Sequence, residues 1–141
     1  MSKLFSSLLE ENMEQFIRCL TSVYSNIPYQ LHTEKEEGEH FYHAILQALF
    51  IASGIKSQAE YSTSQGRADI IVELPKLIYI IEVKVNKKPE EGLEQIEAQQ
   101  YYQPFLHLGK PVRAIGLSFH RRKETNKEKS QFSIAYVTKK L

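Results

Sequence analysis

Asp69, Glu82 and Lys84 are ionisable residues in a stretch that mostly has the composition of buried β-strands. Residues 66–85 read GRADIIVELPKLIYIIEVKV, in which Val, Ile and Tyr predominate around Asp69, Glu82 and Lys84. Burying an unpaired carboxylate or ammonium group costs several kcal/mol or shifts its pKa until the group is neutral. Each of these side chains therefore needs a partner. The partner is another of the three, a water molecule or a metal ion.

The spacing of the three residues predicts a small cluster on one face of a sheet. Side chains alternate across a strand, so Glu82 and Lys84 share a face and Val83 points to the other. A tight turn at residues 75–76 would pair the two strands antiparallel and bring Asp69 near Glu82. A divalent cation relieves the repulsion between two close carboxylates, and hard oxygen ligands suit Mg²⁺ or Mn²⁺.

Two amphipathic helices are expected before this stretch. Apolar residues recur at three- and four-residue spacing over residues 2–24, and this face would pack internally or on a second copy of the chain. A second helix is expected over residues 38–53, with Gly54 as its C-cap. Its predicted buried face consists of Phe41, Ala44, Ile45, Ala48 and Leu49.

The remaining chain predicts a mixed sheet with one further helix. The period of two predicts strands over residues 55–63, 67–74, 77–85, 112–119 and 131–138. A helix is expected over residues 89–109, weakened at its start by Gly92 and broken near Gln103 by Pro104. Residues 120–130 are expected to form an exposed hairpin loop. The order α-α-β-β-β-α-β-β indicates an α/β fold, a mixed central sheet flanked by helices.

Length and composition indicate one domain of a cytoplasmic protein. The chain has 141 residues, and we expect it to form a single domain. This domain would have an N-terminal helical extension over residues 1–30 and a core over residues 38–137. No apolar run spans a membrane, and no export signal is recognised. The single cysteine, Cys19, fits a reducing cytosol. The formal charge of +1 does not indicate nucleic-acid binding, which would need a local basic patch.

The pattern Asp69-x12-Glu82-x-Lys84 resembles the active-site signature of the PD-(D/E)XK nuclease superfamily. Ala68 stands where the name of the superfamily has proline. Further similarity extends over about residues 38–119 and involves Glu39, Glu60, Gln95 and Tyr101. These residues resemble a bacterial branch whose nuclease-like domain follows an AAA-type ATPase-like domain. The resemblance implies a restriction-endonuclease-like α-β-β-β-α-β core, here one excised from a longer chain.

The resemblance also implies roles for individual residues. Asp69, Glu82 and the main-chain carbonyl of Val83 would hold Mg²⁺ or Mn²⁺, with Glu39 completing the set directly or through water. Lys84 would orient the attacking water and stabilise the charge that develops on the phosphate. Gln95 would contact the active centre or the nucleic-acid backbone. The implied activity is metal-dependent hydrolysis of nucleic acid, and DNA is the expected substrate.

The remaining candidates would bind substrate, and each has an ordinary structural alternative. Arg67 would bind a phosphate or a carboxylate, and Tyr101 would stack on a base or belong to the core. The run of Arg121, Arg122 and Lys123 would contact phosphates or remain a solvated loop.

Alternatives also stay open for the other candidate residues and for the domain as a whole. Glu39 would either bind a metal ion or interact favourably with the dipole at the start of its helix. His43, four residues later, would either lie in the active site or be an ordinary core or surface residue. Glu60 is either close to the metal ligands or exposed. Gln95 and Gln99 share a helical face, and only the resemblance selects Gln95. The whole domain could instead be a non-catalytic module that binds nucleic acid or protein beside an ATPase, as a monomer or a homodimer.

Overall fold

The computed structural model describes residues 2–27, 38–63, 66–100, 102–123 and 130–141, and their side chains except those of residues 38, 60–63, 66–69, 122–123 and 130–131. Five strands form one sheet in the order β1-β2-β3-β4-β5. Their bounds are Ser57–Thr63 (β1), Gly66–Glu73 (β2), Ile78–Val85 (β3), Val112–Lys123 (β4) and Ser130–Lys140 (β5). β3 and β4 run parallel, and the other neighbouring strands run antiparallel. This mixed sheet confirms the predicted α/β class.

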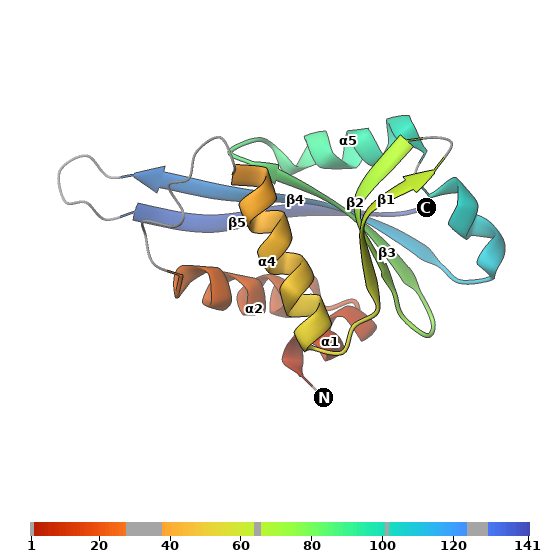
Figure 1. The fold of residues 1–141 in the computed structure, drawn as a ribbon, viewed down its shortest axis with the longest axis horizontal. Helices are drawn as coiled ribbons and strands as arrows, with labels where there is room; N and C mark the ends of the chain where they lie inside the picture. The colour runs from red at the N-terminus through yellow and green to blue at the C-terminus, as the bar shows by residue number, and fades with distance from the viewer. Residues whose placement is uncertain (1, 28–37, 64–65, 101, 124–129) are drawn as a thin grey trace.

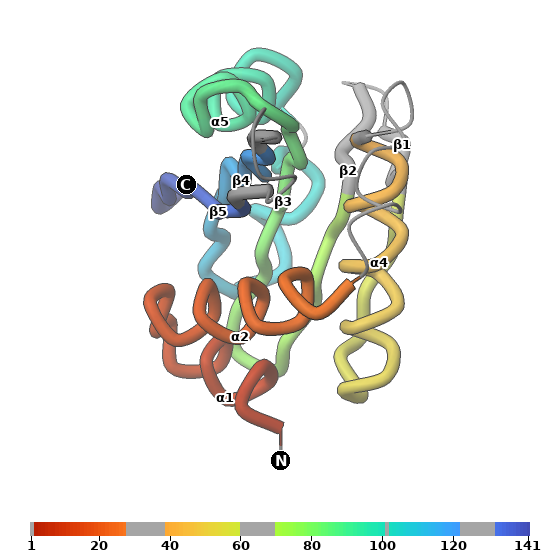
Figure 2. The backbone as a smooth tube through the Cα atoms, turned by 90° about the vertical axis from the view of Figure 1, so that its left-hand side faces the viewer, coloured from red at the N-terminus to blue at the C-terminus, as the bar shows by residue number. Residues whose placement is uncertain are grey.

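Helices cover both faces of the sheet (Figures 1 and 2). Their bounds are Lys3–Leu9 (α1), Met13–Ser25 (α2), Gly38–Ala52 (α4), Pro89–Gln99 (α5) and, for a 3₁₀ helix, Gln103–Leu108 (η1). One core lies between the sheet and α1, α2 and α4, and a second lies between the sheet and α5 and η1. We call these sides of the sheet the α4 face and the α5 face. None of the described helices is long and apolar enough to cross a membrane.

Strand residues alternate strictly between the two cores. On β3, Tyr79, Ile81 and Val83 lie in the core of the α4 face, whereas Ile78 and Ile80 lie in the core of the α5 face. A strand that is covered on both sides reads as a continuous apolar run. This is why the composition of β3 predicted a covered strand.

The N-terminal segment is two helices, not the single helix predicted over residues 2–24. Glu11 lies between them with a φ of 56°, in the left-handed region that ends a helix. The side chain of Asn12 then accepts a hydrogen bond from the Gln15 main-chain N–H at 3.1 Å and caps α2. The predicted apolar face packs internally, since Leu8 and Phe16 are fully buried in the core of the α4 face.

The buried face of α4 is centred one position away from the predicted one. Tyr42, Leu46 and Phe50 are the fully buried residues, and Ala44 and Ala48 are exposed. The predicted Phe41, Ile45 and Leu49 are half-buried at the edge of this core. Large side chains occupy the centre because they fill the space above the sheet that alanine would leave empty. Gly54 follows the helix with a φ of 75°, as its predicted role requires.

The C-terminal half differs from the prediction in two boundaries. The helix predicted over residues 89–109 ends at Gln99, because Gln100 takes a left-handed φ of 54°, before η1 begins. Strand β4 continues to Lys123 and pairs there with Ser130 of β5. Part of the predicted hairpin loop is therefore strand, and residues 124–129 lie outside the described residues.

Two buried tyrosine hydroxyl groups attach the N-terminal helices to the fold. Tyr79 donates to the Leu8 carbonyl at 2.6 Å, and Tyr24 donates to the Tyr42 carbonyl at 2.7 Å. Burial is the main cause that raises the pKa of both phenols. The N-terminal helices thus pack on the sheet and α4 through buried contacts.

Replacing Tyr79 with phenylalanine tests this attachment. We expect Tyr79→Phe to lower the free energy of unfolding by about 1 kcal/mol, because a buried hydrogen bond is lost while the Leu8 carbonyl keeps the Glu11 main-chain N–H at 3.2 Å. Chemical denaturation measures the change. Tyr136→Phe on β5 is the control, and since Tyr136 is half-buried we expect a change within about 0.5 kcal/mol. Equal effects in the two variants would contradict the assignment.

Glu73, at the end of β2, should make stability depend on pH. Its carboxylate accepts a hydrogen bond from Lys110 and pairs with Lys56, each at 3.2 Å, and these contacts hold the pKa of Glu73 below its ordinary value. A lowered pKa stabilises the fold above the pKa of the unfolded chain, about 4.3, and this contribution is lost as the pH falls.

We therefore expect Glu73→Gln to be less stable than the wild type near pH 7 and equal to it near pH 3. The difference should be at most about 1 kcal/mol, because solvent screens a partly exposed pair. Unfolding in urea at several pH values measures it. Glu94→Gln removes an exposed acid of α5 and controls for the change in net charge. A constant difference across this pH range would be the contrary result.

Candidate active site

Glu82 and Lys84 lie on the α5 face of β3. Their positions follow Ile78 and Ile80 in the alternation of the strand, and these two isoleucines belong to the core beneath α5. Glu82 is 2% exposed, whereas Lys84 is half-buried nearer the end of the strand. Glu82 and Lys84 therefore share one face of the strand, as predicted, and α5 covers that face.

Gln95 of α5 contacts Lys84 directly. The ammonium Nζ of Lys84 donates a hydrogen bond to Oε1 of Gln95 at 2.7 Å. Gln95 is half-buried, whereas Gln99, one turn later, is exposed. The helix thus brings Gln95 to the strand, which separates two glutamines that periodicity alone could not distinguish.

Asp69 lies in β2, next to the last residue that pairs with β3. The antiparallel register runs from Glu73–Ile78 to Ile70–Ile81, and the next positions along the two strands are 69 and 82. The turn forms where expected, with the Leu74 N–H donating to the Leu77 carbonyl at 2.9 Å. Beyond this pairing, β3 and the β1–β2 hairpin point in different directions (Figure 1). The side chain of Asp69 lies outside the described ones.

Glu39 is an exposed residue in the first turn of α4. The buried residues of that helix belong to the α4 face, so Glu39 comes from the helix on the other side of the sheet from Gln95. Both α4 and α5 begin at the end of the molecule where β3 ends (Figure 1). His43, one turn later in α4, is half-buried.

Among the basic residues predicted to bind substrate, Arg121 has a described side chain, whereas Arg67, Arg122 and Lys123 do not. It lies in β4, not in the predicted loop, and its main-chain N–H donates to Oδ1 of Asn86 at 3.0 Å. Burial raises the pKa of Tyr42, a residue of the α4 face, and the charge of Arg121 opposes this rise. Alternation along β4 from Leu117 and Phe119, which lie in the core of the α4 face, also assigns Arg121 to that face.

The other candidates are placed by their backbone or not at all. Arg122 and Lys123 lie in β4 opposite Gln131 and Ser130, which corrects their assignment to a loop. Arg67 lies in β2 opposite Ser62. Tyr101 lies outside the described residues, as do the side chains of Glu60, Arg67, Arg122 and Lys123.

Sequence reasoning missed the residues that let α5 lie against Glu82. Gly92, expected to weaken the helix, is buried, and a Cβ atom there would lie 3.2 Å from Cβ of Glu82. Glu82 and Lys84 pair across β3–β4 with Gly116 and Ser118, both of which are buried. The signal in the sequence was Gly116, because a glycine within a buried strand often marks the close approach of another backbone.

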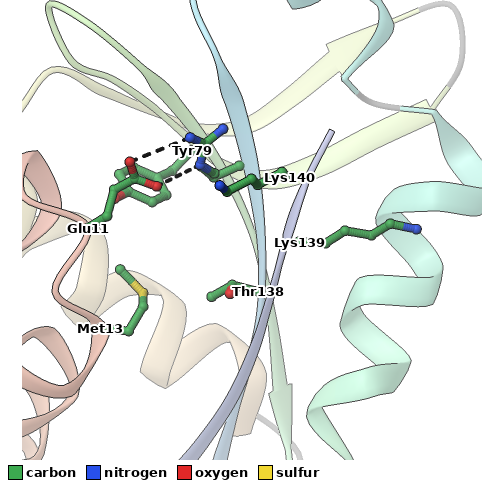
Figure 3. A pocket seen from close by; sticks show the side chains of 7 residues that line it. Glu11, Met13, Tyr79, Thr138, Lys139 and Lys140 are labelled. Carbon is green, nitrogen blue, oxygen red and sulfur yellow. Dashed lines mark hydrogen bonds and ion pairs between the residues drawn. The ribbon is translucent and has the colours of Figure 1, made fainter.

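Figure 3 shows a pocket of about 300 Å³ whose lining does not include Glu82, Lys84 or Gln95. It is lined by Glu11, Met13, Tyr79, Arg113, Thr138, Lys139 and Lys140. Nε of Arg113 donates to Oε1 of Glu11 at 2.6 Å across it. Tyr79 lies on the α4 face near the start of β3, so this pocket is separate from Glu82 and Lys84.

The described side chains contain no group of three or more histidine, cysteine, aspartate and glutamate residues placed to hold a metal ion. The predicted set of Asp69, Glu82 and Glu39 is not covered by that finding, because one of its three side chains is not described. The metal assignment therefore remains a prediction.

Comparison with known proteins identifies the family of this chain. The family model of the PD-(D/E)XK nuclease superfamily matches residues 37–129, which is 93 of the 141 residues. The chain is also 25% identical over 123 residues to a protein of Azotobacter chroococcum mcd 1 named "Uncharacterized protein in vnfD 5'region". That alignment covers 84% of this chain and 24% of the relative, so the chain spans about a quarter of the relative's length.

No solved structure matches the chain significantly. The family match covers the strand with Glu82 and Lys84, the strand with Asp69 and the helix with Gln95, and the mixed sheet with flanking helices is consistent with a restriction-endonuclease-like fold. On these grounds the chain belongs to the PD-(D/E)XK nuclease superfamily.

Proposed function

We propose that this domain is a metal-dependent nuclease that hydrolyses phosphodiester bonds in DNA. The observation that carries the proposal is a buried carboxylate, Glu82, two residues from a lysine that α5 holds through Gln95. The pairing of β2 with β3 supports Asp69 as the second acid, because position 69 follows the Ile70–Ile81 pair.

The chemistry of these groups fits a hard divalent cation. The carboxylates of Asp69 and Glu82 and the main-chain carbonyl of Val83 are all oxygen donors, which Mg²⁺ and Mn²⁺ prefer. Glu39, exposed at the start of α4, is proposed as a further oxygen donor, directly or through water. When bound, such a cation lowers the pKa of water and offsets negative charge on a phosphate.

The protein groups then have separate roles in the proposed reaction. Lys84 would hold the attacking water and donate a hydrogen bond to a phosphate oxygen as negative charge develops there. Gln95 would limit the positions open to the lysine ammonium, because its Oε1 accepts a hydrogen bond from it. Cover by α5 would keep bulk water from Glu82, which strengthens the electrostatic interactions of its carboxylate.

A non-catalytic module beside an ATPase is the second candidate. Two observations favour it: the chain is nearly neutral, with a formal charge of +1, and it spans about a quarter of its Azotobacter relative. A larger protein leaves room for other domains to supply an activity that this domain would only assist.

Metal binding and DNA cleavage separate the two candidates. We expect the wild type to bind Mn²⁺ in calorimetry and to nick plasmid DNA only when Mg²⁺ or Mn²⁺ is added. Asp69→Asn and Glu82→Gln should each reduce cleavage at least about 100-fold, because each removes a negative ligand. Glu73→Gln, a change of the same chemistry at the partly exposed end of β2, should leave cleavage unchanged.

Metal-independent cleavage, or equal cleavage by Glu82→Gln and the wild type, would overturn the nuclease proposal. Absence of both metal binding and cleavage in a folded wild-type domain would favour the non-catalytic module. Circular dichroism and a cooperative thermal transition show that each variant is folded.

A double-mutant cycle tests whether Gln95 holds Lys84. Lys84→Met and Gln95→Ala should be coupled by about 1 kcal/mol in the free energy of unfolding, because either change removes the same charge-assisted hydrogen bond. Lys84→Met combined with Gln99→Ala is the matched cycle, and its coupling should be near zero because Gln99 is exposed. Equal coupling in the two cycles would contradict the assigned contact.

A further inference from the structure

Strand β4 carries two small residues directly beside the two charged residues of β3. The parallel register pairs Glu82 with Gly116 and Lys84 with Ser118. All four residues lie on the α5 face, since Ala114 and Ile80, two residues before Gly116 and Glu82, belong to the core beneath α5.

Gly116 allows α5 to contact the sheet with its backbone. A Cβ atom at this position would lie 2.1 Å from the Pro89 carbonyl oxygen and 2.9 Å from the Leu93 nitrogen. Both are main-chain atoms of the first turns of α5, so they cannot rotate away as a side chain could. Any residue larger than glycine would force the helix and the sheet apart.

Gly92 completes this contact from the helix side. A Cβ atom there would lie 3.2 Å from Cα of Gly116 and 3.3 Å from the carbonyl oxygen of Glu82. The two glycines therefore face each other, and the helix rests on the backbone of β3 and β4 at Glu82. The depth at which α5 lies on the sheet is fixed at this point.

Ser118 fixes the connection that leads into α5. Its side chain is fully buried, and its hydroxyl group donates to the Lys87 carbonyl at 2.5 Å. Lys87 lies between the end of β3 and Pro89, the first residue of α5. Ser118 thus holds the entry of the helix, whereas Gly116 sets the distance from the sheet to its first turns.

We infer that Gly116 and Ser118 are positioning residues that place Gln95 against Lys84 over the buried Glu82. The effect on catalysis rests on the proposed nuclease function, whereas the effect on the Lys84–Gln95 contact does not. The two residues would act through α5, because the helix carries Gln95 into reach of the lysine ammonium group.

The test follows the Lys84–Gln95 contact by NMR in the whole 141-residue chain. The side-chain amide signals of Gln95 are assigned from their loss in Gln95→Ala, and Lys84→Met gives their position without the contact. We expect Gly116→Ala to move these signals toward the Lys84→Met position, and Ser118→Ala to move them less. Unchanged Gln95 signals in folded Gly116→Ala would overturn the inference.

The control is another glycine-to-alanine change that costs stability without steric contact. Gly54 has a φ of 75°, and a Cβ atom there would have no atom within 4 Å, so alanine strains the end of α4 only. Gly54→Ala should leave the Gln95 signals in place. Should Gly116→Ala fail to fold, Gly92→Ala and Ser118→Ala decide the question, since unchanged Gln95 signals in both would overturn the inference.

A kinetic measurement then tests the consequence for catalysis. If the wild type cleaves DNA, Gly116→Ala should lower kcat about 10- to 100-fold with little change in KM, because misplacement of a catalytic group slows the reaction more than binding. Gly54→Ala should stay within about twofold of the wild type at a temperature where both are folded. If the wild type does not cleave DNA, the nuclease proposal fails and the NMR result still decides the inference.

Discussion

A carboxylate that is 2% exposed lies between β3 and α5, and an ionised group at that depth has lost nearly all contact with bulk water. Placing Glu82 there costs free energy that apolar neighbours alone cannot offset. The surrounding fold reflects this constraint. One helix covers the acid, and two glycines let that helix come close. A lysine two residues further along the strand donates a hydrogen bond to a glutamine of the same helix. Selection for stability alone would favour an apolar residue at this position.

Much of the fold could be predicted because it depends on local periodicity. Tyr79, Ile81 and Val83 alternate with Ile78 and Ile80, and a period of two identifies such a strand without any knowledge of its neighbours. The predicted helix boundaries were wrong where the backbone conformation of a single residue ends a helix. Glu11 and Gln100 take left-handed backbone conformations that end helices, although neither is a glycine. Such positions carry no reliable signal in one sequence.

In the candidate site, too, local periodicity predicted some positions, and contacts between distant segments determined the others. Alternation placed Glu82 and Lys84 on one face because both belong to one strand. The choice of Gln95 over Gln99 required the orientation of α5, and the importance of Gly116 required knowing that Pro89 lies above it. These are contacts between segments far apart in the chain, which periodicity does not encode. The placement of Arg121 failed for a related reason, since the charged run after residue 119 continues a strand that β5 supports.

The parallel pairing of β3 with β4 has a consequence for the order in which the domain folds. The antiparallel neighbours β2 and β3 meet through a short turn, where Glu73 pairs with Ile78, whereas Ile78 pairs with Val112, 34 residues later. Closing the longer loop costs more chain entropy, and such pairings form slowly. Glu82 and Gly116 belong to this pairing, so the hairpins at either end of the sheet can form before the acid is enclosed. We therefore expect the carboxylate to stay hydrated through the early steps of folding and to lose its water only when the two halves of the sheet join.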